Sequence, residues 1–444
     1  MDLRRKIADK TVKVAVIGLG YVGLPIAVEF AKAGLETTGI DLDLERVGKI
    51  NRGESYILDV KGEDVASLRQ NIKLRATSDY SVLKGIDVIF ICVPTPFTKA
   101  KDPDISYIVA ATEGIARYLR PGQLIVLQST TYPGTTEEVV LPLLESTGLK
   151  AGRDFYLAFS PERIDPGNRT YGVKNTPKVV GGITPEDTEL ACILFELIIE
   201  RKYIHSVSSP KAAEMTKLLE NVYRSVNIAL VNELTKLCDR MGLDIWEVID
   251  AASTKPFGFM PFYPGPGVGG HCIPVDPYYL SWKAREYDFY TKFVELAAEV
   301  NQSMPFYTVS KVTQALNQQG KTVKGSQILI LGVAFKRDID DPRNSPSLDL
   351  IKILSSRGAQ VFYNDPYVPK IELQTPFLYN QPVPANYTSM ELTEDLLAHM
   401  DCVVIAVKHS LYDFPWIVKY SPLIVDAQNA TKGIVEGREK IFKL

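Results

Sequence analysis

The sequence has few cysteines, no long uninterrupted apolar run and no excess of positive charge, and each absence argues against a class of protein. Its five cysteines lie far apart among 444 residues without a CxxC pair. This spacing argues against a disulfide framework and a zinc ribbon, so no metal site is predicted and a reducing, cytoplasmic compartment is expected. The 50 basic and 53 acidic residues give a net charge of −3, which argues against a nucleic-acid partner.

The N-terminal apolar run, residues 14–28, follows three basic residues as the core of a signal peptide would. Three glycines and a proline interrupt it, no small-residue cleavage site follows, and it is shorter than the roughly 18–20 residues that span a bilayer. We therefore expect a buried strand and turn in a soluble protein without a membrane partner.

Strands alternate with helices in the first half of the chain, which predicts a parallel sheet with right-handed crossovers. The expected helices include 25–33 and 107–118. The expected strands are 13–17, 37–40, 88–93, 124–128 and 155–159.

The middle of the chain is helical. Residues 210–241 show one helical pattern without an internal glycine or proline, and a second long pattern covers 288–316. A loop dense in proline and glycine, 256–277, separates them.

The strand–helix alternation resumes after residue 320, with strands expected at 328–331, 360–363, 401–407 and 423–426. ILILGVAFK resembles VAVIGLGYVG, and VFYNDP resembles TTGIDLD. We predict an α/β protein with two Rossmann-like parallel-sheet domains joined by a central helical spacer that contains a long helix. The expected domains are a first Rossmann-like domain (1–205), a central helical domain (206–318) and a C-terminal Rossmann-like domain (319–444).

A glycine fingerprint follows the first strand and opens a helix: Gly18, Gly20, Tyr21, Val22 and Gly23 lie within it. Gly18 permits the turn, Gly20 lets a pyrophosphate approach the backbone, and Gly23 allows helix–strand packing.

Asp41 ends the next strand, where a carboxylate binds the ribose 2′-hydroxyl and repels a 2′-phosphate. The pair of signals predicts NAD; an ordinary strand–turn–helix glycine cluster is the alternative. Arg46 either lines the adenosine side or is a solvated helix residue.

Cys272 differs from the other cysteines because it lies in an irregular glycine-rich loop, with Asp276 four residues later. A loop thiol beside a cation or helix end has a lowered pKa and is nucleophilic. An inert loop cysteine is the alternative.

Lys217 and Asn221 project from one face of the long helix, where they can hold an oxyanion or a water; a solvated face is the alternative. Glu162 follows a strand at the carboxyl edge of the first sheet and is a candidate base. The strand tips at Thr95 and Thr130 should also face the cofactor.

Lys336 and Arg343 lie where the second Rossmann-like domain would have its phosphate turn, but the glycines for a dinucleotide are missing. A nucleoside diphosphate held by side-chain cations is the natural alternative.

These motifs occur in an order that resembles the UDP-glucose/GDP-mannose dehydrogenase family over nearly the whole chain. The motifs are GLGYVGLP, VPTP, STTYPGTT, SPERIDPG, PGPGVGGHCIPVDP and GVAFKRDIDDPRNSPS. The resemblance implies an NAD domain, a helical dimer spacer giving a homodimer or larger homo-oligomer, and a UDP-sugar domain. It also implies a four-electron oxidation of a sugar C6 alcohol to a carboxylate with two NAD.

The resemblance implies roles for single residues. Cys272 is the nucleophile that forms a thiohemiacetal and then a thioester, Lys217 and Asn221 hold the oxyanion and water, Glu162 is the hydrolytic base, and Asp276 steers protons beside Thr130. The implied NAD contacts are Asp41, Arg46, Thr95, Thr130 and Arg343, with the residues of the glycine fingerprint. The implied UDP-sugar contacts are Glu162, Arg163, Lys217, Asn221, Gly269 and Lys336.

The segment around the nucleophile departs from the glucose-type members. Lys255, Pro256 and Phe257 stand where those carry Arg-Ile-Gly, and Cys-Ile-Pro-Val-Asp replaces Cys-Phe-Pro-Lys-Asp. The segment resembles the UDP-N-acetylhexosamine 6-dehydrogenases of polysaccharide pathways, which favours UDP-N-acetylglucosamine over UDP-glucose as substrate. A single-step β-hydroxyacid dehydrogenase of the 6-phosphogluconate type and a non-catalytic UDP-sugar sensor remain as other hypotheses.

Overall fold

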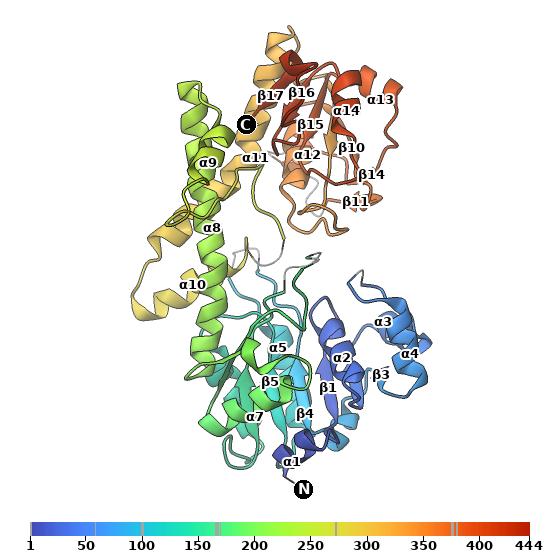
Figure 1. Cartoon of the computed structure of the whole chain (residues 1–444), viewed down its shortest axis with the longest axis vertical. Helices are drawn as coiled ribbons and strands as arrows, with labels where there is room; N and C mark the ends of the chain where they lie inside the picture. Colours follow the sequence, from blue (N-terminus) through green and yellow to red (C-terminus); the bar gives the residue numbers. More distant parts are fainter. Residues whose placement is uncertain are drawn as a thin grey trace. The chain divides into compact units, whose positions relative to one another are not determined.

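The computed structural model describes residues 2–57, 59–98, 102–164, 168, 170–270, 273–373, 377–378 and 381–444. It consists of two compact units (Figure 1). The first comprises Met1–Glu220 and Tyr278–Tyr290, and the second comprises Asn221–Pro277 and Thr291–Leu444. The three-domain division of the chain stays a prediction.

The first unit contains an eight-stranded sheet with the strand order β3-β2-β1-β4-β5-β6-β7-β8. All its strand pairs are parallel except β6–β7, which is antiparallel, so the predicted parallel sheet is confirmed apart from this pair. The strands are β1 (Val14–Ile17), β2 (Thr37–Ile40), β3 (Leu74–Thr77), β4 (Val88–Ile91), β5 (Leu124–Leu127), β6 (Tyr156–Phe159), β7 (Lys178–Gly182) and β8 (Ile204–Ser206).

Helices cover both faces of this sheet, because alternate residues of each buried strand point to opposite faces. In β4, Val88 and Phe90 belong to one apolar core, and Ile89 and Ile91 belong to another. The helices are α1 (Leu3–Ala8), α2 (Gly23–Lys32), α3 (Leu44–Arg52), α4 (Gly62–Gln70), α5 (Ser106–Ala116), α6 (Leu141–Glu145) and α7 (Pro185–Phe195).

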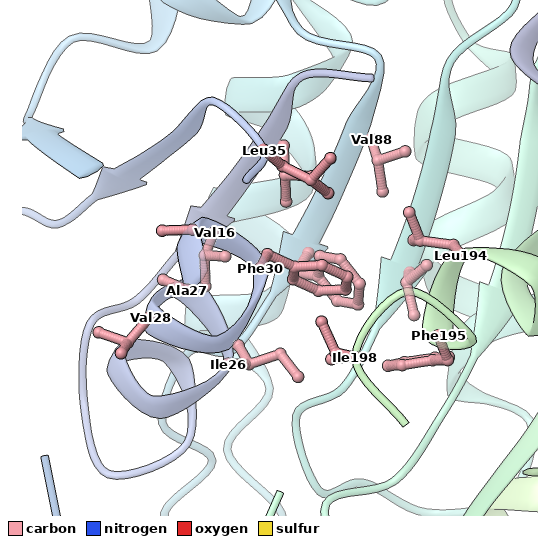
Figure 2. Close-up of a cluster of buried hydrophobic side chains, with 14 of the residues drawn as sticks. Val16, Ile26, Ala27, Val28, Phe30, Leu35, Val88, Leu194, Phe195 and Ile198 are labelled. Atoms are coloured by element: carbon pink, nitrogen blue, oxygen red, sulfur yellow. The ribbon is translucent and has the colours of Figure 1, made fainter. Parts of the chain in front are cut away.

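Aromatic rings join α2, α7 and β4 in the first of these cores. Figure 2 shows Phe30 of α2 beside Phe195 of α7, and their ring centroids are 6.4 Å apart. Phe90 of β4 lies 5.2 Å from Phe30 and 5.8 Å from Phe195. Such ring pairs stabilise packing beyond the burial of their area. They fix α2, and with it the glycine turn that precedes this helix.

The second unit contains a five-stranded, fully parallel sheet with the order β10-β9-β15-β16-β17. This order repeats β2-β1-β4-β5-β6 of the first unit, which confirms a second Rossmann-like sheet. Its strands are β9 (Gln327–Leu331), β10 (Gln360–Asn364), β15 (Cys402–Ile405), β16 (Ile424–Asp426) and β17 (Ile441–Lys443). Two small antiparallel pairs join β11 (Lys370–Glu372) to β14 (Asn386–Thr388) and β12 (Phe377–Leu378) to β13 (Gln381–Pro382).

The helices of the second unit that lie wholly within it are α9 (Ile245–Ala252), α11 (Lys292–Gln318), α12 (Pro346–Ser356), α13 (Glu394–His399) and α14 (Phe414–Tyr420). Two further helices are α8 (Pro210–Met241) and α10 (Asp276–Ala284). The predicted long helix at 210–241 is confirmed. The helix predicted at 288–316 begins only at Lys292, because Asp288 has a left-handed φ of 51°. None of the helices within the described ranges is long and apolar enough to cross a membrane.

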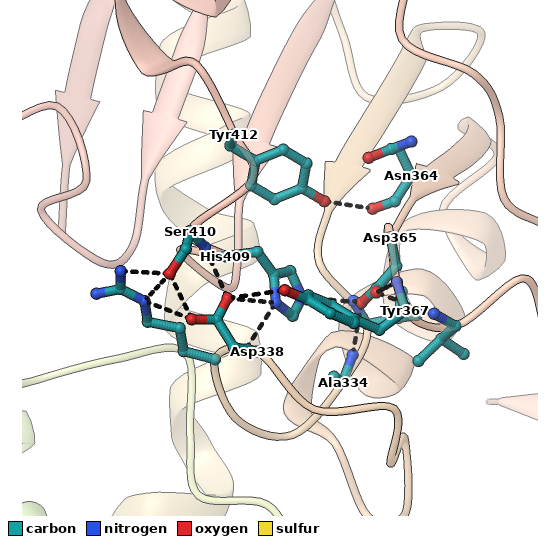
Figure 3. A network of polar contacts seen from close by, with 11 residues as sticks. Ala334, Asp338, Asn364, Asp365, Tyr367, His409, Ser410 and Tyr412 are labelled. Carbon is teal, nitrogen blue, oxygen red and sulfur yellow. Dashed lines mark hydrogen bonds and ion pairs between the residues drawn. The ribbon is translucent and has the colours of Figure 1, made fainter. Parts of the chain in front are cut away.

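The two Rossmann-like sheets share a polar signature. Asp41 after β2 accepts a hydrogen bond from the Leu19 N–H at 2.8 Å, and Asp365 after β10 accepts one from the Val333 N–H at 2.7 Å. In the second sheet, however, the carboxylate is fully buried beside His409, whose Nε2 lies 3.1 Å from Asp365 Oδ2 (Figure 3). Protein groups therefore occupy the place where a ribose would meet the carboxylate, which agrees with the missing glycines.

Candidate active site

The glycine fingerprint forms the tight turn that a dinucleotide requires. Gly18 has a φ of +89°, and a Cβ there would lie 2.6 Å from the Cys92 carbonyl oxygen. A Cβ at Gly23, the first residue of α2, would lie 1.8 Å from the Gly18 carbonyl oxygen. A Cβ at Gly20 would meet no atom within 4 Å, which leaves room for a pyrophosphate at the helix N-terminus. The residues present therefore fit NAD.

Asp41 is fixed in position at the end of β2. Its Oδ1 accepts from the Asp43 N–H at 2.9 Å, its Oδ2 accepts from the Leu19 N–H, and Arg46 Nη1 lies 3.6 Å from Oδ2. Tyr56, which sequence reasoning missed, donates its hydroxyl to the Leu19 carbonyl at 2.6 Å. Tyr21 is exposed beside the turn, and Val22 caps α2. The structure thus brings Asp41 and Arg46 to the glycine turn.

The strand tip after β4 carries Thr95, which is half-buried. Tyr279 of α10 donates its hydroxyl to the carbonyls of Thr95 at 2.6 Å and Pro96 at 2.9 Å. Tyr279 is fully buried and was missed because only the tertiary fold brings it to this tip. The backbone of the tip is therefore held in place.

Lys217 of α8 donates a hydrogen bond from Nζ to the Thr130 hydroxyl, and its side chain is buried. One turn earlier, Glu214 accepts from the backbone N–H groups of Gly134 at 2.5 Å and Thr136 at 2.9 Å. It also accepts from the Thr136 hydroxyl at 2.7 Å. Glu214, another residue that sequence reasoning missed, therefore ties the loop after β5 to the helix that carries Lys217.

Glu214 should make stability depend on pH. Burial raises its pKa from the ordinary 4.5 to about 7. Because the folded pKa exceeds the unfolded one, this contribution to stability is complete below pH 4.5 and is lost as the pH rises through 7. In wild type, Glu214 should lower the free energy of unfolding as the pH rises from 4.5 to 8. In Glu214→Gln this decrease should be smaller by about 3 kcal/mol. Urea unfolding of both proteins across this range measures the difference, and identical slopes would contradict the expectation.

Glu162 lies just beyond β6, and four donors hold its carboxylate. Oε1 accepts from the backbone N–H groups of Arg163 at 2.8 Å and Ile164 at 3.0 Å. Oε2 accepts from Gln128 Nε2 at 2.9 Å and from Lys178 Nζ at 2.7 Å. Burial by itself would raise the pKa of Glu162, but the Lys178 charge and these hydrogen bonds hold the pKa below its usual range. The site therefore contains a buried, ionised carboxylate.

Arg163 points its guanidinium at α8. It forms a two-pronged ion pair with Glu220, at 2.6 Å and 3.1 Å, and donates to the Pro177 carbonyl at 2.8 Å. The side chain is half-buried. Its predicted contact with a UDP-sugar stays a prediction.

In the second unit, Asn221 of α8 donates from Nδ2 to Asp276 Oδ2 at 2.5 Å. Asp276 is the first residue of α10 and is buried. The structure therefore brings together an amide and a carboxylate that the sequence separates by 55 residues. Cys272 lies outside the described residues.

The loop before Cys272 packs tightly against residues 335–346. A Cβ at Gly269 would lie 2.7 Å from the Phe335 Cβ. Gly270 donates its N–H to the Arg343 carbonyl at 3.1 Å and accepts from Asn344 Nδ2 at 3.0 Å.

Lys336 and Arg343 belong to the segment against which this loop packs. Lys336 is half-buried, and the Arg343 guanidinium lies 2.5 Å from Asp341 Oδ2. Both predicted cations are thus beside the glycine loop, and neither predicted ligand contact is tested.

Two buried asparagines support the same loop and were missed by sequence reasoning. Asn232 of α8 accepts at Oδ1 from the Gly265 N–H at 3.1 Å, and its Nδ2 donates to Asn301 Oδ1 at 2.9 Å. Asn301 of α11 in turn donates to the Ser225 carbonyl at 3.0 Å. In the described part of the chain, no cluster of three or more His, Cys, Asp or Glu side chains is arranged to hold a metal.

Comparisons with known proteins identify the family. Models of the UDP-glucose/GDP-mannose dehydrogenase family match as the NAD-binding domain at 12–199, the central domain at 211–303 and the UDP-binding domain at 329–433. A UDP-N-acetyl-D-glucosamine 6-dehydrogenase of Pseudomonas aeruginosa is 41% identical over 360 residues, covering 81% of this chain and 84% of the relative. One of Salmonella typhi is 36% identical over 402 residues, covering 90% and 91%.

A solved structure agrees with these matches. The UDP-D-ManNAc dehydrogenase of Pyrococcus horikoshii superposes with a TM-score of 0.85 at 33% identity, covering 96% of this chain and 97% of that one. With its dinucleotide turn, its second Rossmann-like sheet and these matches along nearly its full length, the chain belongs to the UDP-glucose/GDP-mannose dehydrogenase family of NAD-dependent UDP-sugar dehydrogenases.

Proposed function

We propose that this dehydrogenase oxidises the C6 alcohol of a UDP-N-acetylhexosamine, with UDP-N-acetylglucosamine as its substrate, to the uronic acid in a four-electron reaction. The product would be a precursor for polysaccharide synthesis. NAD, when bound, accepts one hydride in each of two successive oxidations. Gly18, Gly20, Gly23 and Asp41 would hold this cofactor. The buried carboxylate of Glu162 is the observation that carries the mechanism, because thioester hydrolysis needs a base that stays ionised at neutral pH.

Cys272 carries the covalent steps in this proposal. Its thiolate adds to the C6 aldehyde to form a thiohemiacetal, which loses a hydride and a proton to become a thioester. Water then attacks the thioester carbonyl, the C–S bond breaks, and the thiolate and the carboxylic acid are released. Lys217 and Asn221 donate hydrogen bonds to the oxyanion and the water, which stabilises the charge that develops in each addition.

Glu162 takes the proton from the attacking water in this proposal. Its two oxygens already accept four hydrogen bonds, so the water has to replace one donor. The Asn221–Asp276 hydrogen bond fixes the amide, so that Asp276 orients Asn221 and receives protons near it. Thr130 orients the ammonium of Lys217.

The substrate assignment rests on the loop before Cys272 and on the names of the relatives. The backbone at Gly269 and Gly270 approaches residues 335–346 too closely for side chains. In this proposal, backbone groups elsewhere in the 258–270 segment pair with an acetamido amide, because the Gly270 N–H already bonds the Arg343 carbonyl. Phe335 offers an apolar wall for the acetyl methyl group. The relatives from P. aeruginosa and S. typhi are named UDP-N-acetyl-D-glucosamine 6-dehydrogenases. Lys336 and Arg163 would bind the nucleotide-sugar, and Arg343 would contact NAD.

A panel of UDP-sugars tests the substrate. We expect kcat/KM for UDP-N-acetylglucosamine to exceed that for UDP-glucose by about tenfold to a hundredfold, because a buried partner of the amide loses about 1–3 kcal/mol when it is left unpaired. NADH release is measured for both sugars and for the N-acetylmannosamine and N-acetylgalactosamine epimers, with mass analysis of each product. Faster oxidation of UDP-glucose would favour the glucose-type alternative, and no NADH with any sugar would favour a sensor.

The long helix α8 supports the predicted homodimer. Its exposed face carries apolar side chains at spacings of three, four and seven residues, the pattern of a helix seam. These residues are Met215, Leu219, Tyr223, Leu230, Leu234, Leu237 and Met241. Contiguous exposed apolar surface of this kind marks a protein–protein interface. We therefore propose that α8 pairs with a second copy of the chain.

A further inference from the structure

Lys178 is a fully buried lysine to which the reaction scheme above gives no task. It is the first residue of β7 and 0% exposed, and its ammonium lies 5.9 Å from the centre of the Phe195 ring. A charged lysine is costly to bury and is almost never found buried without a partner. Its Nζ lies 2.7 Å from Glu162 Oε2. The carboxylate of the proposed base therefore supplies the partner that this buried lysine requires.

The antiparallel pairing of β6 and β7 brings the two residues together. The register pairs Ala158 with Gly182 and Phe159 with Gly181. Continuing this register by three residues sets Lys178 opposite Glu162. If β7 ran parallel to β6, its first residue, Lys178, would lie beside the start of β6 and away from Glu162. The single antiparallel pair in the sheet is thus what supplies the carboxylate with a cation.

A second strand tip completes the support on the same oxygen. Gln128, just beyond β5, donates from Nε2 to Glu162 Oε2 at 2.9 Å. The Cys92 thiol, just beyond β4, donates a hydrogen bond to Gln128 Oε1 at 3.6 Å. This bond orients the amide so that its nitrogen faces the carboxylate. Side chains from β7 and from the ends of β5 and β4 therefore hold the one carboxylate that follows β6.

We propose that Lys178 is a positioning residue for thioester hydrolysis: through its ion pair with Oε2 it keeps the Glu162 carboxylate ionised and oriented while Cys272 carries the acyl group. The inference rests on the proposed function of Glu162. It differs from a purely structural role because it concerns the protonation of the base. Without the ammonium, burial favours the neutral carboxylic acid, which cannot accept a proton from water.

The charged and titratable groups around Glu162 come from β7, from the ends of β4 and β6, and from α8. Lys178 faces it from β7 and the Cys92 thiol faces it from the end of β4, where burial raises the pKa of the thiol. Arg163 follows it in the chain, but the guanidinium is turned to Glu220 of α8. Among the residues that the structure describes, Lys178 is therefore the cation that contacts the carboxylate.

The test is the pH dependence of acyl-enzyme loss. Each enzyme is mixed with NAD and UDP-N-acetylglucosamine, quenched at successive times, and analysed by intact-protein mass. In wild type, hydrolysis should stay fast down to pH 5. The acid limb of the pH profile is the range in which hydrolysis slows as the pH falls. In Lys178→Met, we expect this limb to lie about one to three pH units higher, so that the rate recovers at high pH. A loss of rate by the same factor at every pH would overturn the proposal.

Three further variants separate the possible causes. Lys311→Met removes another buried lysine, paired with Asp239 at 2.6 Å, and should leave the acid limb unchanged. Lys178→Gln keeps an amide donor and replaces Lys178→Met if the methionine variant does not fold, with the same upward shift expected. In the double variant of Glu162→Gln with Lys178→Met, the acid limb should disappear and the rate should equal that of Glu162→Gln alone.

The outcomes distinguish the two proposals. If Glu162→Gln does not slow acyl-enzyme loss, the base assignment fails, and the role of Lys178 fails with it. If Glu162→Gln slows that step but both Lys178 variants keep the wild-type acid limb, only the role of Lys178 fails.

Discussion

Cys272→Ala is expected to lower kcat for complete oxidation by a factor on the order of 10⁴ or more, because no other group on the chain is proposed to hold the aldehyde covalently. Without the thiol, no thiohemiacetal forms. The second oxidation then lacks the intermediate from which the hydride is removed. At most one NADH per enzyme-bound sugar should then appear, measured by absorbance at saturating UDP-N-acetylglucosamine. The affinity for NAD, measured by calorimetry, should not change, because the glycine turn and Asp41 do not depend on the thiol.

Cys192→Ala is the matched control for the cysteine variant. Cys192 is a buried free thiol on α7, within the apolar core of the first sheet. Its removal should cost some stability but leave two NADH per sugar. If Cys272→Ala completes the four-electron oxidation at a rate close to that of wild type, the covalent mechanism is wrong.

Glu162→Gln is expected to stop the reaction one step later. Both oxidations should occur once, giving a burst of two NADH per active site, and hydrolysis should then be slower by about 10²–10⁴-fold, the usual contribution of a general base. The acyl group should remain on Cys272, where intact-protein mass and peptide mapping locate it. If Glu162→Gln slows only the first oxidation, the role of base belongs to another residue.

The glutamine variant also carries a predictable loss of stability. Four donors surround the Glu162 carboxylate, so one orientation of the amide sets its NH₂ group against Lys178 and the other sets it against two backbone N–H groups. Melting temperature should be recorded beside the kinetics. Glu189→Gln, at an exposed ion pair with Arg4, makes the same chemical change outside the site and should alter neither quantity appreciably.

Features that depend on residues close together in the sequence were predicted well. The glycine spacing predicts a tight strand–turn–helix, and the turn at Gly18 and Gly23 confirms it. The ribose contact of Asp41 stays a prediction. The second Rossmann-like sheet was also visible, because its strands repeat the apolar pattern of the first. The family and its use of NAD are confirmed by the comparisons.

Features that depend on tertiary pairing were not visible. Lys178 begins an apolar strand, and only the antiparallel register with β6 makes it the partner of Glu162. Asn232 and Asn301 are unremarkable helix residues until α8 and α11 pack and the Gly265 backbone joins them. Glu214 is an ordinary charged helix residue in the sequence, but it is buried because the loop after β5 folds over it.

The ratio of NADH formed to sugar consumed decides whether this enzyme carries out a four-electron oxidation. A limiting, weighed amount of UDP-N-acetylglucosamine is oxidised to completion with excess NAD, and NADH is measured by absorbance while the product is identified by mass. We expect two NADH per sugar, a carboxylate product and no free aldehyde that hydroxylamine can trap. One NADH per sugar with an aldehyde product would contradict it.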